Sequence, residues 1–220
     1  MTELILIRHG QASFGAADYD VLSKLGHRQS VALGQALAAT GCQPDAVFMG
    51  GQRRHRETLE GLAQGLALDP GAAVIDEGLN EFAFGALLDA RHGKGIRPEG
   101  MGKDRAAHFR ELRDCVLCWQ RDELSGVPER FAQFTDRVVA AHDAMARAGK
   151  TVLAVSSGGA ISRLVAHVMQ APPAQMIQLQ LQMKNSAVTR LRIGRGGTVL
   201  QTFNETPHIG PHSADLLSYS

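Results

Sequence analysis

Short continuous runs of apolar residues alternate along this chain with stretches whose apolar residues recur at helical spacing. The clearest runs are Leu4-Ile5-Leu6-Ile7, Ala46-Val47-Phe48-Met49 and Thr151-Val152-Leu153-Ala154-Val155, and Val74-Ile75 is a shorter one. Continuous aliphatic runs of this length are typical of strands that are covered on both faces of a sheet. The pattern therefore predicts a mostly parallel sheet at the centre of the fold.

Helical spacing follows each of the three clearest runs. The first is followed by a predicted helix with Leu33 and Leu37 on its apolar face and an end near Gly41. Similar patterns cover residues 59–66 and 161–168, which predicts β-α-β units with right-handed crossovers. Residues 187–193 and 198–203, on either side of a glycine pair, predict a hairpin that completes the sheet.

The middle of the chain departs from this alternation. Residues 91–103 mix Gly, Pro, His, Lys and Arg without a period, and a helical pattern then runs over residues 106–124. Pro128 is expected to be the first residue of a further helix. We expect a helical cap, roughly residues 86–130, inserted into a single domain that spans residues 1–220. The predicted fold is an α/β three-layer sandwich with a mostly parallel central sheet flanked by helices.

Composition narrows the class of protein. The chain has 220 residues, 44% of them hydrophobic, and a formal net charge of +1. This balance gives no reason to expect nucleic acid or a membrane surface as a partner. The cysteines Cys42, Cys115 and Cys118 are odd in number, which argues against a secreted disulfide framework. No signal peptide or run of membrane-spanning length is evident, so we expect a soluble cytoplasmic protein.

Polar residues that could act in catalysis or binding follow the predicted strands. The first strand ends in Arg8-His9-Gly10, which offers a cationic fork, an imidazole that can act as nucleophile or base, and a backbone that a ligand can approach closely. Ligands bind beyond the carboxyl ends of strands in open α/β sheets. Taken alone, an Arg-His pair at a strand end also fits a simple exit of the chain to solvent.

The second strand is followed by the densest positive run of the chain, which includes Arg53, Arg54 and Arg56. Helical spacing allows at most one or two of these arginines to face the same site. Positive charge opposes the dipole at a helix N-terminus, so a bound anion would offset that cost. A solvated basic helix start is the alternative interpretation.

A carboxyl group follows the short strand at Val74-Ile75. Glu81 lies between Leu79 and Phe82, whose apolar side chains would disfavour the charged carboxylate and raise its pKa towards the range of a general acid. Glu77 is the second candidate, and an ordinary surface glutamate is the alternative for either residue.

The third strand ends in Ser156-Ser157-Gly158-Gly159, at the start of a predicted helix whose free N–H groups would suit a phosphate. A serine-hydrolase elbow does not fit, because Val155 stands where its first glycine would be. Ser13, in the loop after the first strand, can also donate to an anion. A histidine held between arginines and a helix N-terminus would accept a phosphoryl group without a metal or cofactor.

At these positions the chain resembles the histidine phosphatase superfamily, which shares its fold with the phosphoglycerate mutases. The resemblance rests on Leu6-Ile7-Arg8-His9-Gly10-Gln11, on Leu22-Ser23-Lys24-Leu25-Gly26-His27-Arg28-Gln29, on an arginine four residues before Thr58, and on Leu79-Asn80-Glu81-Phe82-Ala83-Phe84-Gly85. It implies that His9 is the phosphorylated nucleophile, Arg8 and Arg54 are phosphate clamps, and Glu81 is the proton donor.

One departure from the family pattern bears on activity. Members usually carry Ser/Thr-His-Gly-Gly after the late strand, so Ser157 stands in place of the second pocket histidine. Loss of one oriented donor in such a site costs roughly 10²–10³ in turnover. An asparagine that many members carry soon after Arg-His-Gly is also missing, and Ser13 is its nearest polar substitute. His208 is a candidate for restoring charge to the pocket, with a surface histidine as the alternative.

The sequence therefore predicts a phosphomonoester hydrolase that acts through phospho-His9, with the Ser157 substitution reducing its rate. Mutase activity is less expected, because the intermediate would have to survive until a second hydroxyl is in place. The alternative is an impaired pseudophosphatase that binds a phosphorylated ligand or partner. The expected partner is a phosphorylated small molecule, and a homodimer is one option for assembly. Basic residues of the cap, against ordinary surface, are candidates for recognising its outer charge: Lys94, Arg97, Lys103 and Arg105.

Overall fold

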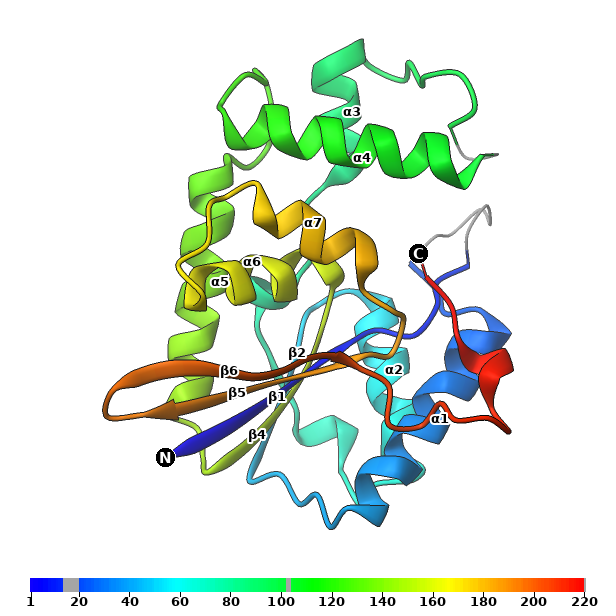
Figure 1. The fold of residues 1–220 in the computed structure, drawn as a ribbon, viewed down its shortest axis with the longest axis vertical. Helices are drawn as coiled ribbons and strands as arrows, with labels where there is room; N and C mark the ends of the chain where they lie inside the picture. Colours follow the sequence, from blue (N-terminus) through cyan, green and yellow to red (C-terminus); the bar gives the residue numbers. More distant parts are fainter. Residues whose placement is uncertain (14–19, 102–103, 220) are drawn as a thin grey trace.

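One six-stranded sheet organises the computed structural model, which describes residues 1–13, 20–101 and 104–219 (Figure 1). The strands are β1 (Thr2–Arg8), β2 (Ala46–Met49), β3 (Val74–Ile75), β4 (Thr151–Ser156), β5 (Val188–Gly194) and β6 (Gly197–Glu205). The helices are α1 (Lys24–Ala39), α2 (Arg53–Ala63), α3 (Phe84–His92), α4 (Arg105–Gln120), α5 (Phe131–Ala146), α6 (Gly158–Val168) and α7 (Gln175–Gln182). The described residues also form the short 3-10 helices η1 (Pro70–Ala72), η2 (Glu77–Leu79) and η3 (Ala214–Leu216).

The strand order is β3-β2-β4-β1-β5-β6, which confirms the predicted mostly parallel sheet. Strands β3, β2, β4 and β1 are parallel, and the hairpin β5–β6 adds two antiparallel strands beside β1. Arg8 at the end of β1 is in register with Ser156 at the end of β4. The residues that follow these strands therefore begin at one shared edge of the sheet.

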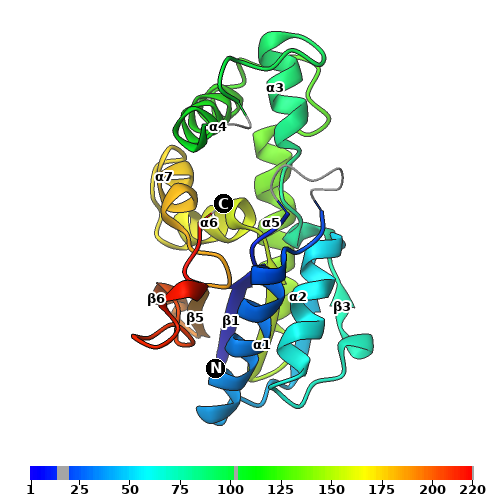
Figure 2. The same cartoon turned by 90° about the vertical axis from the view of Figure 1, so that its right-hand side faces the viewer.

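Alternate residues of β1 feed two separate apolar cores. Ile5 and Ile7 pack with Leu33 of α1 and Leu59 of α2 on one face. Leu4 and Leu6 belong to the larger core that includes residues of α4, α5, α6 and α7. Side chains on a strand point alternately to the two faces, so the continuous aliphatic run of β1 is what a central strand of a three-layer fold requires. Figure 2 shows α1 and α2 together on one side of β1.

Gly10 fixes the turn that follows β1. A Cβ atom at this position would lie 2.6 Å from the carbonyl oxygen of Gly26 in α1, which is closer than real Cβ contacts. Its N–H donates to Thr58 Oγ1 in α2 at 3.1 Å. Because only glycine allows this approach, the chain leaves β1 pressed against the start of α1 and the middle of α2.

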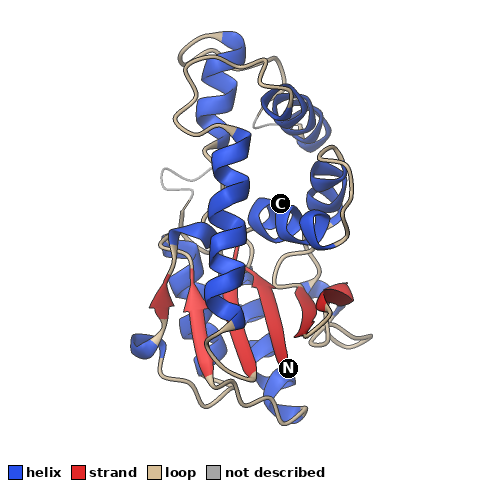
Figure 3. Ribbon diagram, turned by 90° about the vertical axis from the view of Figure 1, so that its left-hand side faces the viewer, coloured by secondary structure: helices blue, strands red, loops and turns tan. Residues whose placement is uncertain are grey.

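Helices α3 and α4 lie beyond the carboxyl edge of the sheet, and α5 runs from the sheet towards them (Figures 1 and 3). The prediction that Pro128 begins a helix is wrong, because α5 starts at Phe131. The carbonyl of Glu129 accepts a hydrogen bond from Trp119 Nε1 at 2.8 Å, which ties this stretch to α4. The first helical turn begins only after that contact.

The three cysteines form no disulfide among the described residues. Cys115 is buried, Cys42 and Cys118 are half-buried, and all three are free. Over the described ranges, no helix is both long and apolar enough to cross a membrane.

Candidate active site

His9 follows β1 directly and is only 4% exposed. Its Nδ1 lies 2.7 Å from the carbonyl oxygen of Gly10. A carbonyl oxygen can only accept, so Nδ1 carries the ring proton and Nε2 keeps its lone pair. The backbone on either side is held by hydrogen bonds from His9 N to the Ser156 carbonyl and from Ser186 N to the His9 carbonyl. The Gly10 carbonyl therefore orients the His9 ring, and Nε2 is the nitrogen that is available as a nucleophile.

Two arginines act on this imidazole. Burial, followed by the charges of Arg54 and Arg8, holds the pKa of His9 well below its usual value. Arg8 donates to the carbonyl of Met183. A Cβ atom at Gly158 would lie 3.3 Å from Arg8 Nε, so the start of α6 lies against the same guanidinium. His9 is therefore neutral at physiological pH and available for attack.

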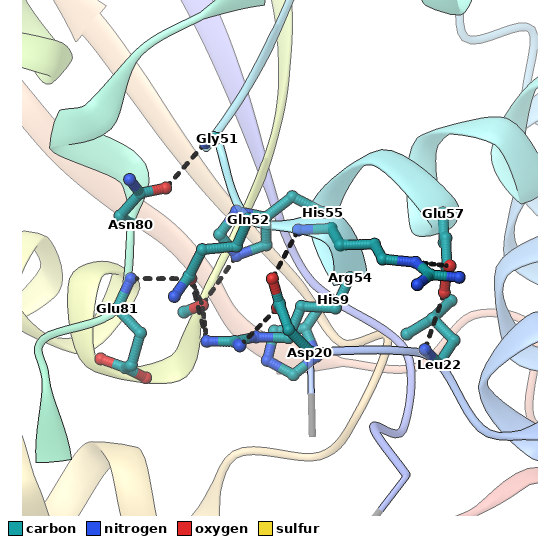
Figure 4. Close-up of polar contacts among 12 residues, drawn as sticks. His9, Asp20, Leu22, Gly51, Gln52, Arg54, His55, Glu57, Asn80 and Glu81 are labelled. Atoms are coloured by element: carbon teal, nitrogen blue, oxygen red, sulfur yellow. Dashed lines mark hydrogen bonds and ion pairs between the residues drawn. The ribbon is translucent and has the colours of Figure 1, made fainter. Parts of the chain in front are cut away.

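Arg54 is the arginine of the basic run that faces the site. Its Nη1 donates to Asp20 Oδ1 at 2.7 Å and its Nη2 to Gln52 Oε1 at 2.9 Å (Figure 4). Asp20 Oδ2 also accepts from the N–H of Arg53 at 2.8 Å, at the start of α2. One carboxylate therefore fixes both the helix start and the guanidinium.

The other two arginines of the run point elsewhere, as helical spacing predicted. Arg53 Nε donates to Glu57 Oε1 at 2.7 Å, and Arg56 pairs with Glu60 at 3.9 Å. Both arginines are exposed, whereas Arg54 is buried. Each of them has a carboxylate one helical turn further along α2.

Glu81 reaches the same edge from the segment after η2. Its Oε2 accepts from Gly159 N at 2.9 Å, and its backbone N–H donates to Gln52 Oε1 at 3.1 Å. A side chain at Gly159 would overlap this carboxyl group, so glycine is required there. Burial raises the pKa of Glu81, against the lowering effects of the Gly159 hydrogen bond and the arginines. This is the direction predicted from its apolar neighbours.

Ser157 caps the start of α6 and is fully buried. Its Oγ lies 2.7 Å from Nε2 of His55, 3.3 Å from Gln52 Oε1 and 3.5 Å from Arg54 Nη2. His55 is also fully buried, and its ring centroid lies 5.8 Å from that of His9. The serine is therefore part of a dense polar cluster beside the arginine and the candidate nucleophile.

Three other predicted candidates lie differently. Glu77 is exposed. Ser13 donates its backbone N–H to the Val21 carbonyl at 2.8 Å, and its role in phosphate binding stays a prediction. His208 is buried rather than on the surface, and its Nε2 lies 2.8 Å from Oγ of Ser186, the residue that bonds the His9 carbonyl. Burial lowers the pKa of His208 to about 4, so it supports the His9 backbone as a neutral side chain.

The basic residues of the cap are mostly at the surface. Lys94 and Arg105 are exposed, and Arg97 donates to Asp89 Oδ1 at 2.6 Å. Lys103 lies outside the described residues. Their role in recognising a substrate stays a prediction.

One cluster within the described residues has side chains that could hold a metal ion, and it lies in the cap. Ligand atoms of His92, Glu111 and Cys115 all lie within 4.8 Å of one another. Glu111 Oε1 is already 2.6 Å from His92 Nε2 and 3.5 Å from Arg91 Nε. A guanidinium on the same carboxylate competes with a cation, so hydrogen bonding accounts for this cluster.

The polar cluster at the sheet edge is suited to phosphoryl transfer. It combines an oriented neutral imidazole, two guanidinium groups and a carboxyl group with a raised pKa. Cations around a nucleophile stabilise the charge of a transferring phosphoryl group, and the acid can protonate a leaving oxygen. The fold and the site together define a phosphoryl-transfer class of enzyme.

Comparison with known proteins agrees with this class. The model of the histidine phosphatase superfamily, branch 1, matches residues 4–206. The chain belongs to the histidine phosphatase superfamily, and it is a phosphatase of that class.

Individual relatives are distant in sequence. The metal-independent phosphoserine phosphatase of Arabidopsis thaliana is 24% identical over an alignment of 219 residues that covers 95% of this chain and 84% of that protein. A phosphoserine phosphatase mutant from Entamoeba histolytica, in complex with phosphoserine, superposes with a TM-score of 0.66 at 21% identity, covering 95% of this chain and 100% of that one. The mycobacterial glucosyl-3-phosphoglycerate phosphatase with inorganic phosphate has a TM-score of 0.65 at 23% identity, covering 96% and 100%.

Sequence reasoning missed three residues of the cluster, Asp20, Gln52 and His55. Asp20 lies in a stretch of the sequence without a hydrophobic period, and Gln52 directly precedes the arginines of the basic run. His55 was hidden inside that run, where its neighbours drew attention to charge. The only signal available was the helical spacing itself, because His55 and Thr58 share one face of α2.

Proposed function

We propose that this protein hydrolyses phosphomonoesters through a phosphohistidine intermediate on His9. The observation that carries the proposal is the oriented Nε2 of a buried, neutral His9 beside Arg8 and Arg54. In the first step Nε2 attacks phosphorus and the bond to the ester oxygen breaks. The protonated carboxyl of Glu81 gives its proton to that leaving oxygen.

The second step returns the enzyme to its starting state. Water attacks phosphorus, its proton passes to the Glu81 carboxylate, and the bond between phosphorus and Nε2 breaks to release phosphate. The raised pKa of Glu81 suits both roles, because the group must hold a proton in one step and accept one in the next. Arg8, Arg54 and the start of α6 at Ser157-Gly158 would hold the phosphoryl oxygens throughout.

The substrate class that we propose is a small phosphorylated molecule. Similar proteins are named as phosphatases of phosphoserine and of glucosyl-3-phosphoglycerate, which supports this size class. Helices α3 and α4, beyond the carboxyl edge, would form the cap that contacts the rest of the substrate. Hydrolysis is favoured over mutase activity, which needs a second hydroxyl placed beside the intermediate.

The binding-only alternative rests on one observation, the serine at position 157. A pseudophosphatase would keep the cations and bind phosphate without turnover. Vanadate or phosphate would then raise the melting temperature while no phosphate is released from an ester.

The test is release of phosphate from an aryl phosphate between about pH 4 and 8. The native protein is expected to turn over, and His9→Ala is expected to lose at least about 10³-fold in kcat. His142→Ala is the matched control, because His142 lies towards the opposite end of the sheet. It bonds Thr198 in β6, Thr198 pairs with Ile193 in β5, and Ile193 pairs with Thr2 at the start of β1. Native turnover that survives in His9→Ala would contradict the mechanism, and no turnover at any pH would favour the binding-only alternative.

A further inference from the structure

We propose that His55 is a positioning residue of this site, and that its imidazole acts through the Ser157 hydroxyl in place of the second pocket histidine of the family. The proposal rests on the phosphatase function proposed above. It assigns a role to a residue outside the family signature. It also accounts for the serine at position 157 as one half of a pair rather than as a defect.

The geometry brings the two side chains together from different elements. His55 lies in the first turn of α2, and Ser157 lies between β4 and α6. His55 Nε2 is 2.7 Å from Ser157 Oγ, and both side chains are fully buried. The ring centroids of His55 and His9 are 5.8 Å apart, so the imidazole enters the pocket from the α2 side.

Gly50 and Asn80 define the space that this ring fills. A Cβ atom at Gly50 would overlap His55 Nδ1 and would lie 2.6 Å from Asn80 Oδ1. Asn80 Oδ1 accepts from Gly51 N at 2.7 Å, which holds the end of β2 against the segment before Glu81 (Figure 4). A glycine at position 50 is therefore what admits an imidazole here, and the small hydroxyl at position 157 completes the fit.

The hydrogen bonds indicate how the pair would work. The Ser157 hydroxyl donates to Gln52 Oε1, so the proton in its 2.7 Å contact with His55 is the ring proton on Nε2, which is donated to Ser157 Oγ. The distance from Ser157 Oγ to its acceptor, Gln52 Oε1, is 3.3 Å.

A phosphoryl oxygen would take the place of Gln52 as that acceptor. Gln52 Oε1 already accepts from Arg54 Nη2 at 2.9 Å and from Glu81 N at 3.1 Å, so it can release the hydroxyl at little cost. The resulting chain runs from His55 Nε2–H to Ser157 Oγ–H to the phosphoryl oxygen, and donors in such chains strengthen one another. Burial and the neighbouring Arg54 lower the pKa of His55 to about 3, against the raising effect of the Gly50 backbone, which keeps the ring neutral for this role.

The same geometry explains why restoring histidine at position 157 alone would not help. Two imidazoles would compete for a buried space that now holds one ring and one hydroxyl, and overpacking of this kind is destabilising. The exchange variant His55→Ala with Ser157→His removes one ring before adding the other. It moves the imidazole to the position that it has in the family pattern.

The experiment measures kcat and KM for an aryl phosphate with five variants. They are His55→Ala, Ser157→Ala, the double alanine variant, the exchange variant and Ser157→His alone. His55→Ala and Ser157→Ala are each expected to lower kcat by roughly 10- to 100-fold with little change in KM, because Arg8 and Arg54 still bind the phosphate. The kcat of the double alanine variant should lie within about twofold of that of either single variant, because each single substitution already breaks the same chain of donors.

Rescue separates a functional role from a structural one. The exchange variant should exceed the double alanine variant by about tenfold or more in kcat, whereas Ser157→His alone should not exceed the native protein. His55→Gln, which keeps an N–H donor, is measured as well, so that a poorly folded alanine variant does not decide the result. It should retain more activity than His55→Ala, and His142→Ala should match the native protein.

Three outcomes would overturn the proposal. They are a kcat within about twofold of native in both His55→Ala and Ser157→Ala, additive losses in the double variant, and an exchange variant no faster than the double alanine variant. If His9→Ala abolishes turnover in the same assay, each of these results rejects the role of His55 and leaves the proposed function standing. If His9→Ala keeps native turnover, the proposed function itself has failed.

Discussion

Arginines are used in opposite ways in the pocket and in the cap. In the cap, each of several guanidinium groups has a carboxylate beside it; the pairs are Arg91–Glu111, Arg97–Asp89 and Arg121–Glu123. In the pocket, burial lowers the pKa of a histidine, and the charges of two buried arginines lower it further. The cap thus neutralises its charges locally, while the pocket gathers like charge around a neutral ring.

The difference separates charges that are paired near the surface from buried charges that act on one ring. Exposed ion pairs contribute little to stability and are screened by salt. Buried cations around an imidazole carry a folding cost, and an anion bound there would offset it. Asp20 balances part of this charge at Arg54, from a position that also caps α2. The pocket is therefore the place where removal of one charge should matter most.

The largest effect is expected from Arg54→Gln. Loss of a buried cation that stabilises the transferring group should lower kcat by roughly 10²–10³. Arg56→Gln, two residues along the same helix and paired with Glu60 at the surface, should stay within about twofold of native. Steady-state kinetics of both variants check this contrast. Equal losses in kcat would show that the direction in which an arginine of the basic run points does not decide its role.

Glu81→Gln should give the next largest effect, and its size should depend on the leaving group. An alkyl phosphate needs a proton on its leaving oxygen, so its hydrolysis should fall by about 10²–10³, whereas an aryl phosphate with a good leaving group should lose about tenfold or less. The exposed Glu77→Gln is the control. A loss of the same size for both substrates would contradict a proton-donor role.

The pH profile sharpens the same assignment. Because the acid form of Glu81 is the active one and burial raises its pKa, the rate with an alkyl phosphate should fall as pH rises through that raised value. His9 should not limit the rate on the acid side until pH falls well below 6, since its pKa is held far below about 6.5. The fall in rate at alkaline pH should be absent in Glu81→Gln. If the variant keeps the same fall, a group other than Glu81 causes it.

The free energy of unfolding should depend on His208 at acid pH. Burial lowers its folded-state pKa to about 4, so the unfolded chain takes up a proton first as pH falls below the ordinary value of about 6.5. Stability is then complete above pH about 6.5 and is lost between there and pH about 4, by about 3 kcal/mol from this one group. Urea unfolding at both ends of this window should show a smaller loss for His208→Gln than for the native protein.

The smallest effect is expected in the cap. Arg97→Gln breaks an exposed ion pair with Asp89 and should leave kcat for a small aryl phosphate within about twofold of native. A larger loss with a bulkier phosphorylated substrate would give Arg97 the recognition role that the sequence suggested.

Local patterns were enough to predict the sheet and most of the edge where the site lies. The aliphatic runs placed His9 and Ser157 after β1 and β4, and the apolar neighbours of Glu81 gave the direction of its pKa shift. Helical spacing limited which arginine could face the site, although it did not select Arg54 without the following threonine. These inferences succeeded because each depends on residues close together in the chain.

Local sequence patterns do not predict contacts between segments that are far apart in the chain. His55 and Ser157 are on different elements, and nothing in the basic run indicates that one of its members bonds the turn after β4. Asp20 is also far in the sequence, 34 residues, from the arginine that it holds. The start of α5 at Phe131 was not predicted either, and the residue after Pro128, Glu129, accepts a hydrogen bond from Trp119 of α4.

The stereochemical course at phosphorus tests the central claim most directly. A phosphomonoester made chiral at phosphorus with oxygen isotopes and sulfur is hydrolysed, and the configuration of the product is read by ³¹P NMR. Attack by His9 Nε2 followed by attack of water inverts phosphorus twice, so the product should retain the original configuration. Inversion would mean that water attacks the ester in a single step, and the phosphohistidine mechanism would be wrong.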